Sequence, residues 1–223
     1  MYWKKYNSNL EKLSKVLLKH NKNHTFNHVE DSFYNHVRDI VAIEIVNKIE
    51  TKKNETFVLD YGSNFVPWSN ITNKINTKKL NVTVYDPFSK QAEDNIKIKN
   101  EFSCKKFSSL NEISKMSFDI TIFGSVIQYI DDFYELIKKS DFLKAPKLIF
   151  THTPLSLKRE FDSMQFSDFK GHQKIYSFVE LNNFLKKFGY ECTFKSTLDP
   201  KLAQSEDKFL DNLVYANLIF KQK

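Results

Sequence analysis

The chain has 223 residues, 41% of them hydrophobic and 15% aromatic, so it can bury a sizeable core and is not a disordered chain. Its net charge is +7, but Arg38 and Arg159 are its only arginines, and the scattered lysines disfavour a protein that reads nucleic-acid sequence. No stretch approaches the roughly 18 apolar residues that cross a bilayer, and the first residues lack the apolar segment of a signal peptide, so we expect a cytoplasmic protein.

Two amphipathic helices are predicted near the start of the chain. Apolar residues recur at helical spacing over about 8–20 and again over about 31–50. The segment 21–28 between them has no periodicity and is predicted to be a loop. We therefore expect residues 1–50 to form an N-terminal helical extension, through which a homodimer could form.

The rest of the chain alternates between strand and helix patterns. Strands are predicted at about 56–60, 82–86, 102–107, 118–123 and 147–151, and helices at about 89–99, 110–115, 131–140 and 177–189. A long loop from about His152 to Tyr176 follows the fifth strand, and two closing strands at 190–195 and 213–220 are expected to pair antiparallel. This order predicts an α/β domain over residues 51–223, with a doubly wound, mostly parallel sheet.

Neither the cysteines nor the histidines have the spacing of a metal site. Cys104 and Cys192 are far apart, and we expect them to be buried thiols. Four histidines gather near the N-terminus: His20, His24, His28 and His36. No cysteine or carboxylate completes a ligand set beside them, so no metal site is predicted.

Two predicted strands each end in an acid. Asp60 closes the first strand and Asp86 the second, with a helix-length segment between them. Gly62 has no Cβ, so the backbone of the first turn could approach a ligand closely. An acid after the second strand can accept hydrogen bonds from both hydroxyls of a ribose. The alternative is that both acids cap helices, a position that suits aspartate.

The segment after the fourth predicted strand has the composition of a site. Small residues lie at Gly124–Val126, a polar and an aromatic side chain follow at Gln128 and Tyr129, and two acids precede the next helix. This turn is expected at the same sheet edge as the two acids. The alternative is a helix start that packs on the sheet.

His152 follows the fifth predicted strand, at the edge where open α/β sheets place their ligands. Its ordinary pKa near 6.5 suits removal of a proton from an acceptor hydroxyl. The alternative is a polar loop residue. The long loop 152–176 carries phenylalanines and cations that would suit a sugar or a sugar nucleotide, or it is a helical insert whose phenylalanines pack on the domain.

This order of elements resembles the class I S-adenosylmethionine-dependent methyltransferase fold, a seven-stranded doubly wound sheet preceded by helices. The resemblance covers about 56–220. It implies that S-adenosylmethionine is the cofactor and that the residues of three turns bind it: Asp60, Tyr61, Gly62 and Ser63 after the first strand, Asp86 and Pro87 after the second, and Gly124, Ser125 and Val126 after the fourth.

A narrower pattern is similar to a methyltransferase family that is often encoded among bacterial surface-polysaccharide genes. Gln128-Tyr129 matches one turn of that family, and Thr151–Leu155 matches another, with His152 in place of an arginine. This resemblance implies O-methylation of a sugar, a glycan precursor or another small molecule. His152, Gln128 and Tyr129 would then be the catalytic residues, with His152 as the proton acceptor.

The chain departs from the class I pattern at two places. Asn64 could replace one of the usual glycines, but Phe65-Val66 stands where another is usual, and the segment Cys104–Ser109 lacks the acid that contacts the adenine amine. Two hypotheses therefore stay open. The chain is an active methyltransferase, or it is a catalytically degenerate relative that serves as a binding or partner subunit through residues 8–50.

Overall fold

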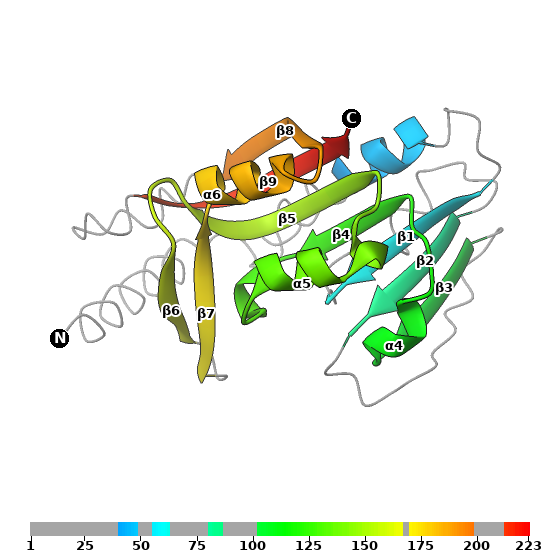
Figure 1. The fold of residues 1–223 in the computed structure, drawn as a ribbon, viewed down its shortest axis with the longest axis horizontal. Coiled ribbons are helices and arrows are strands. Elements are labelled where there is room, and N and C mark those ends of the chain that lie inside the picture. Colours follow the sequence, from blue (N-terminus) through cyan, green and yellow to red (C-terminus); the bar gives the residue numbers. More distant parts are fainter. Residues whose placement is uncertain (1–39, 49–54, 63–79, 87–101, 167–169, 199–211) are drawn as a thin grey trace, which may run out of the picture.

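A twisted sheet with helices on both faces organises the chain (Figure 1). The computed structural model describes residues 40–48, 55–62, 80–86, 102–166, 170–198 and 212–223. The helices predicted at 8–20 and 89–99, the histidine group, Ser63 and Pro87 lie outside these ranges. So does the first part of the helix predicted over 31–50, of which residues 40–48 are described and helical.

Nine strands are present in the described part of the chain: β1 (Thr56–Tyr61), β2 (Leu80–Tyr85), β3 (Phe102–Phe107), β4 (Ile120–Gly124), β5 (Lys147–Ser156), β6 (Phe161–Phe166), β7 (Lys170–Ser177), β8 (Tyr190–Leu198) and β9 (Leu213–Gln222). Among the described residues after 48, the helical elements are α4 (Leu110–Ile113), η1 (Ile127–Tyr129), α5 (Phe133–Lys139), η2 (Asp141–Leu143) and α6 (Phe178–Lys186).

Seven of these strands form the predicted doubly wound sheet. Strands β3, β2, β1, β4 and β5 lie in that order and pair in parallel. Strand β9 pairs antiparallel with β5, and β8 pairs antiparallel with β9. The order of the parallel strands reverses at β1 and β4, which is where open α/β sheets bind their ligands.

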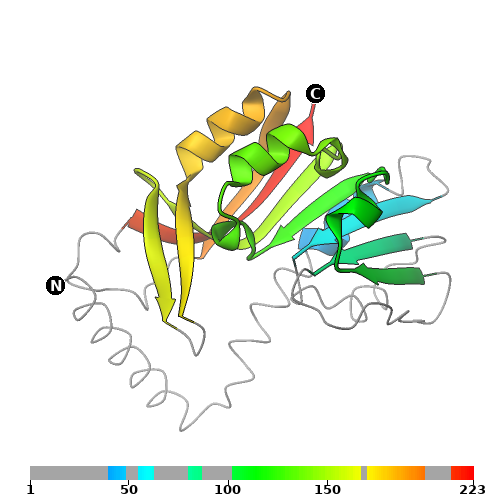
Figure 2. The same cartoon turned by 60° about the horizontal axis from the view of Figure 1, so that its bottom comes forward.

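The remaining two strands correct the prediction of a long loop over 152–176. Strand β5 continues to Ser156, and β6 and β7 form an antiparallel hairpin. The last β5 residue that pairs with β4 is Thr151, whereas β7 pairs with β5 from Leu155 onward. Strand β7 therefore pairs with the same edge of β5 as β4 does, but further along β5, where β4 has ended. The hairpin projects beyond the carboxyl end of β4 (Figure 2).

The hairpin is fastened to η1 and α5. The Tyr176 hydroxyl donates a hydrogen bond to Ile130 O at 3.2 Å and accepts one from Phe133 N at 3.2 Å. Lys174 Nζ lies 3.2 Å from Glu160 Oε2 and 5.0 Å from the centroid of the Tyr176 ring. These contacts hold the hairpin beside the carboxyl ends of the parallel strands.

Apolar residues fill both faces of the sheet. On one face, Ile40, Val41 and Ile45 of the 40–48 helix pack on the parallel strands. On the other face, the Phe123 and Phe150 rings stack with centroids 5.1 Å apart, and the Phe133 ring of α5 meets Phe123 edge-on. Burial of each such side chain stabilises the fold by about 1.5–3 kcal/mol.

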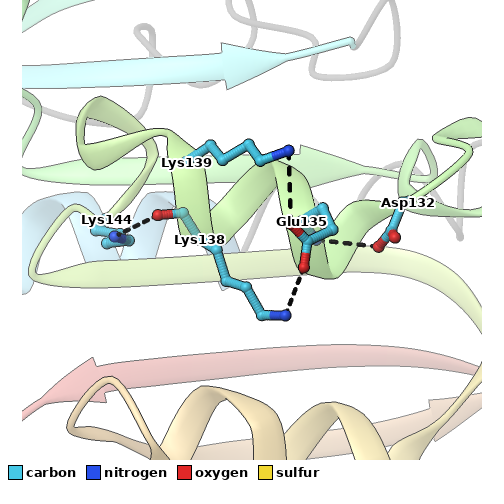
Figure 3. A network of polar contacts seen from close by, with 5 residues as sticks. All are labelled: Asp132, Glu135, Lys138, Lys139 and Lys144. Atoms are coloured by element: carbon cyan, nitrogen blue, oxygen red, sulfur yellow. Dashed lines mark hydrogen bonds and ion pairs between the residues drawn. The ribbon is translucent and has the colours of Figure 1, made fainter.

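Polar side chains cap both ends of helix α5 and form ion pairs along its exposed side (Figure 3). The Asp132 carboxylate accepts a hydrogen bond from Glu135 N at 3.0 Å, so Asp132 is the N-cap. Lys138 Nζ and Lys139 Nζ lie 2.5 Å and 3.6 Å from the Glu135 carboxylate. Lys144 Nζ donates to Lys138 O at 3.2 Å, which satisfies a carbonyl of the last turn.

Helix α6 begins at Phe178 and ends at Lys186, so it is shorter than the helix predicted over about 177–189. Gly189 follows the helix with φ +82°, as expected for a terminating glycine. Ser177 occupies the N-cap position, but its hydroxyl donates to Lys158 O at 3.0 Å and makes no capping bond. The Ser177 hydroxyl therefore joins β7 to the connection between β5 and β6 instead of capping the helix. Cys192 is half-buried rather than buried.

Buried charges hold the amino end of the sheet. Glu44 of the 40–48 helix is buried, and its carboxylate lies 2.6 Å from Lys147 Nζ and 3.4 Å from Lys221 Nζ. These two lysines face each other on β5 and β9. Asp119 accepts a hydrogen bond from Phe57 N at 3.1 Å. This end of the sheet is therefore held by paired charges.

Candidate functional site

The carboxyl ends of the parallel strands are joined by backbone hydrogen bonds. Gly62 N donates to Tyr85 O at 2.6 Å, which links the turn after β1 to the end of β2. Asp86 N donates to Phe107 O at 3.0 Å, which links β2 to β3. The turns that the sequence singled out for ligand binding therefore lie side by side.

Gly62 lies against the turn that follows β4. Its φ is +73°, and a Cβ built on it would lie 2.3 Å from Cγ2 of Val126. Both the backbone conformation and the close approach require glycine. The close approach that the structure shows at Gly62 is to the Val126 side chain, whereas the expected approach to a ligand stays a prediction.

The two acids predicted at strand ends are buried at this edge. Asp60 is 1% exposed and Asp86 is 7% exposed. Asp60 lies within β1, where it is in register with Val84 and Ile122 on the flanking strands. A residue inside a strand cannot cap a helix, so the capping alternative is excluded for Asp60. Asp86 directly follows β2.

The Tyr61 ring belongs to the core. It lies 4.8 Å from the Tyr85 ring and 5.6 Å from the Phe123 ring, measured between centroids. Burial raises the pKa of the Tyr61 hydroxyl well above its usual range. The structure therefore assigns the Tyr61 side chain to packing, and only its backbone lies beside Gly62.

The turn after β4 is closed by Gln128. Ser125 has φ +50°, a left-handed conformation that is uncommon for residues with a Cβ. Gln128 is 3% exposed, and its Nε2 donates to Ser125 O at 2.9 Å and to Ser125 Oγ at 3.2 Å. Its Oε1 is buried without a hydrogen-bond partner in the described part of the chain. Tyr129, in contrast, is 41% exposed.

His152 is the second residue of this edge in a left-handed conformation, with φ +46°. It lies beside Ser125, because Gly124 and Thr151 are register partners and Ser125 N donates to Thr151 O at 2.8 Å. The register of β5 against β9 shifts between Phe150 and Thr153, so His152 lies in a β-bulge. The predicted turn over Thr151–Leu155 is therefore a bulge in a continuing strand.

The environment of His152 differs from the sequence-based expectation of an ordinary pKa. Its ring stacks on Tyr215 with centroids 4.4 Å apart and an interplanar angle of 14°. Burial lowers the pKa of the imidazole to about 4. At neutral pH the imidazole is therefore uncharged and weakly basic.

The structure thus groups most of the residues singled out from the sequence and adds two from β9. Gly62 meets Val126, and Ser125 lies between Gln128 and His152. Tyr215 and Asn217 contact His152 and were missed. A signal for Asn217 exists, because it is the polar residue within an apolar run from 213 to 220.

No protein-family model and no curated protein matches this sequence. Solved structures do share the fold. Coclaurine N-methyltransferase, bound to N-methylheliamine and S-adenosylhomocysteine, is 10% identical with a TM-score of 0.56 over 99% of this chain and 95% of its own. Magnesium protoporphyrin IX methyltransferase from Synechocystis PCC 6803, with bound S-adenosylhomocysteine, is 11% identical with a TM-score of 0.55 over 98% and 99%.

A third structure is 1,6-didemethyltoxoflavin-N1-methyltransferase from Burkholderia thailandensis, with S-adenosylhomocysteine bound. It is 10% identical with a TM-score of 0.53, over 98% of this chain and 89% of its own. At these identities the likeness establishes the fold, which is the Rossmann-like fold of class I S-adenosylmethionine-dependent methyltransferases. The three names describe three different acceptors, so the fold leaves the acceptor open.

Proposed function

We propose that this chain is an S-adenosylmethionine-dependent methyltransferase whose cofactor lies across the carboxyl ends of β2, β1 and β4. One observation carries the proposal. In a sheet with the methyltransferase fold, the buried acids Asp60 and Asp86 lie at the carboxyl edge, where the Gly62 and Val126 turns meet. Sheets of this type bind ligands at this edge.

The charges of the site fit this cofactor. The chain has a net charge of +7, yet the described residues proposed for the site include two acids, Asp60 and Asp86, and no lysine or arginine. S-adenosylmethionine carries a positive sulfonium, which acids stabilise and cations repel. On this proposal Asp86, directly after β2, accepts hydrogen bonds from the ribose hydroxyls.

The protein would contribute mainly alignment. The bound cofactor supplies an activated methyl group. Gln128 holds the Ser125 turn, and Ser125 lies beside His152. A neutral His152 imidazole can accept a hydrogen bond from an acceptor hydroxyl and hold its oxygen in line with the methyl group. With a pKa of about 4, His152 would orient the hydroxyl more than it removes the proton.

For the acceptor we propose a sugar, a glycan precursor or another small molecule in surface-polysaccharide biosynthesis. The support is the sequence resemblance at Gln128-Tyr129 and Thr151–Leu155. The exposed Tyr129 side chain and the fixed β6–β7 hairpin would then border the acceptor. In the described part of the chain, no helix is long and apolar enough to cross a membrane.

Calorimetric titration with S-adenosylmethionine and S-adenosylhomocysteine tests the proposal. We expect binding to the unmodified chain and binding weaker by about tenfold or more in Asp86→Asn, because a hydrogen bond to a charged group is lost. Asp141→Asn is the matched control, since Asp141 is exposed on η2 and pairs with Lys144. An unchanged affinity in Asp86→Asn would overturn the ribose assignment.

The catalytically degenerate alternative is favoured by one observation, which is that Val126 occupies the space beside Gly62. On this alternative the chain would keep the fold and act as a binding or partner subunit. The same titration separates the two functions. The absence of heat at high micromolar concentrations of both ligands would favour the degenerate subunit.

A further inference from the structure

Strand β9 contacts His152 at two points. Tyr215 stacks on the His152 ring with centroids 4.4 Å apart, and Asn217 Oδ1 accepts a hydrogen bond from His152 N at 2.9 Å. Tyr215 and Asn217 are two residues apart on one strand, so their side chains lie on the same face of it. One face of β9 therefore contacts both the ring and the backbone of His152.

The backbone contact meets a need that the bulge creates. In an antiparallel ladder, a bulge leaves one residue without its regular partner. Thr151 and His152 together stand opposite Asn217, because Phe150 pairs with Leu218 and Thr153 pairs with Ala216. An unpaired backbone N–H is costly when buried, and the left-handed conformation of His152 adds strain. The side-chain oxygen of Asn217, Oδ1, supplies the acceptor that the His152 N–H would otherwise lack.

The Asn217 side chain is itself held in place. It is 0% exposed, and its Nδ2 donates to Ser196 Oγ at 3.2 Å on β8. Ser196 and Asn217 are register partners in the β8–β9 pair. The amide is thus bonded at both ends, with its oxygen toward β5 and its nitrogen toward β8.

We propose that Asn217 is a positioning residue that holds His152 in its bulged, left-handed conformation with its ring against Tyr215. The role of His152 at the acceptor rests on the proposed function, whereas the coupling between Asn217 and His152 does not. In this respect Asn217 parallels Gln128, since each buried amide side chain bonds to a left-handed residue: Gln128 to Ser125 directly after β4, and Asn217 to His152 in the bulge of β5.

The alternative is that Asn217 only stabilises the pairing of β8 with β9. Both roles predict lower stability for Asn217→Ala, so a stability measurement does not distinguish them. The conformation of His152 in the folded variant does distinguish them, because only the positioning role predicts that it changes. Its ring protons report stacking on Tyr215 through the ring-current shift, and exchange of its amide hydrogen with solvent reports the bond to Asn217.

The experiment is NMR of the cofactor-free chain carrying Asn217→Ala, Asn217→Asp, Ser196→Ala or Asn183→Ala. In Asn217→Ala we expect loss of the ring-current shift and amide exchange that is about tenfold faster, corresponding to one lost hydrogen bond. Asn217→Asp keeps an acceptor oxygen, and the Ser196 hydroxyl can donate to it, so both signals should be retained. Asn183→Ala, at an exposed position of α6, should change neither signal.

Two results would overturn the proposal. One is a folded Asn217→Ala variant in which the ring shift and the amide exchange of His152 are unchanged. The other is an Asn217→Asp variant that loses both signals. If Asn217→Ala does not fold, Ser196→Ala provides the test, because release of the amide nitrogen should partly accelerate exchange at His152, and an unchanged rate would contradict the coupling. Since no cofactor is present, failure here is distinct from failure to bind S-adenosylmethionine.

Discussion

The two ends of the parallel sheet are built differently. At the amino end, Glu44 joins a helix to two strands through Lys147 and Lys221, with extended backbone on both strands. At the carboxyl end, Ser125 and His152 hold left-handed conformations on neighbouring strands. Charge pairing dominates one end, and backbone strain is concentrated at the other.

We infer from this difference that the amino end of the sheet mainly stabilises the fold, and that the carboxyl end is the part proposed to bind ligands. Strained backbone persists only where the surroundings determine it fully, and it clusters at functional sites. Here the surroundings are two buried amides, Gln128 and Asn217. Changes at the amino end should therefore affect stability alone, whereas changes at the carboxyl end should also affect ligand binding.

The largest stability effect is expected for Glu44→Gln. Removing this charge leaves Lys147, at the start of β5, facing Lys221, near the end of β9, and breaking a buried ion pair costs about 3–5 kcal/mol. Urea denaturation measures the loss. The affinity of the folded variant for S-adenosylmethionine should be unchanged.

Glu180→Gln is the control, because Glu180 is exposed on α6 and its replacement should change the free energy of unfolding by less than about 0.5 kcal/mol. If Glu44→Gln is as stable as this control, the amino end is not held by its charges. The contrast between the two ends would then be lost.

Gly62→Ala should come next, with a loss of about 2–4 kcal/mol from overpacking and from the positive φ together. The added methyl group would meet Val126. Truncation of that side chain in Gly62→Ala/Val126→Ala should recover about 1–2 kcal/mol, measured as the coupling energy of a double-mutant cycle. Strictly additive losses would show that the two turns do not touch.

His152 predicts a pH dependence of stability. Its folded-state pKa of about 4 lies below the unfolded value near 6.5, so the unfolded chain binds the proton first as the pH falls. Between pH 6.5 and 4, His152 should therefore destabilise the fold progressively, by about 1–3 kcal/mol in total. Above pH 6.5 it should contribute nothing.

The His152→Asn variant isolates this contribution, because asparagine tolerates the left-handed conformation and does not titrate. Urea denaturation at pH 7 and at pH 4.5 should show a smaller acid loss for His152→Asn than for the unmodified chain. Equal losses would mean that the imidazole titrates normally and is not buried against Tyr215.

The smallest effect is expected on the surface of α5. Glu135 pairs with two exposed lysines, Lys138 and Lys139, and exposed pairs contribute little to stability. Glu135→Gln should leave the urea midpoint essentially unchanged. The change of the midpoint with salt concentration should also be the same in Glu135→Gln as in the unmodified chain. A clear loss of stability in Glu135→Gln would show that an exposed ion pair stabilises the fold as well. The effect of Glu44→Gln could then not be assigned to the burial of its ion pairs.

The parallel sheet could be predicted because β1, β2 and β4 are short runs rich in apolar residues, and because strand and helix patterns alternate along this part of the chain. The run predicted at 102–107 is β3 itself, and that at 56–60 is β1 without its last residue. The hairpin was not predicted, since Phe161–Phe166 mixes polar and apolar residues and, unlike β3, does not stand in the alternation of strands and helices. Its pairing depends on an edge of β5 that is free only because β4 ends at Gly124.

The candidate site was predictable where a polar side chain comes at the end of an apolar run, as for Asp86 after β2 and for His152, although β5 continues beyond His152 to Ser156. Its supporting residues were not. Asn217 contacts His152 across 65 positions of sequence, through a bulge that shifts the register of two strands. Hydrophobic periodicity shows that a strand is present over 213–220, but it does not show which residue of that strand stands opposite the bulge.

The central claim is that the carboxyl end of the sheet binds S-adenosylmethionine and the amino end does not. Titration of the isotope-labelled chain with S-adenosylmethionine, followed through backbone amide resonances, tests this claim directly. We predict shifts at Gly62, Asp86 and Ser125 and none at Glu44 and Lys221. The absence of shifts at saturating cofactor, or shifts centred on the amino end, would contradict the account.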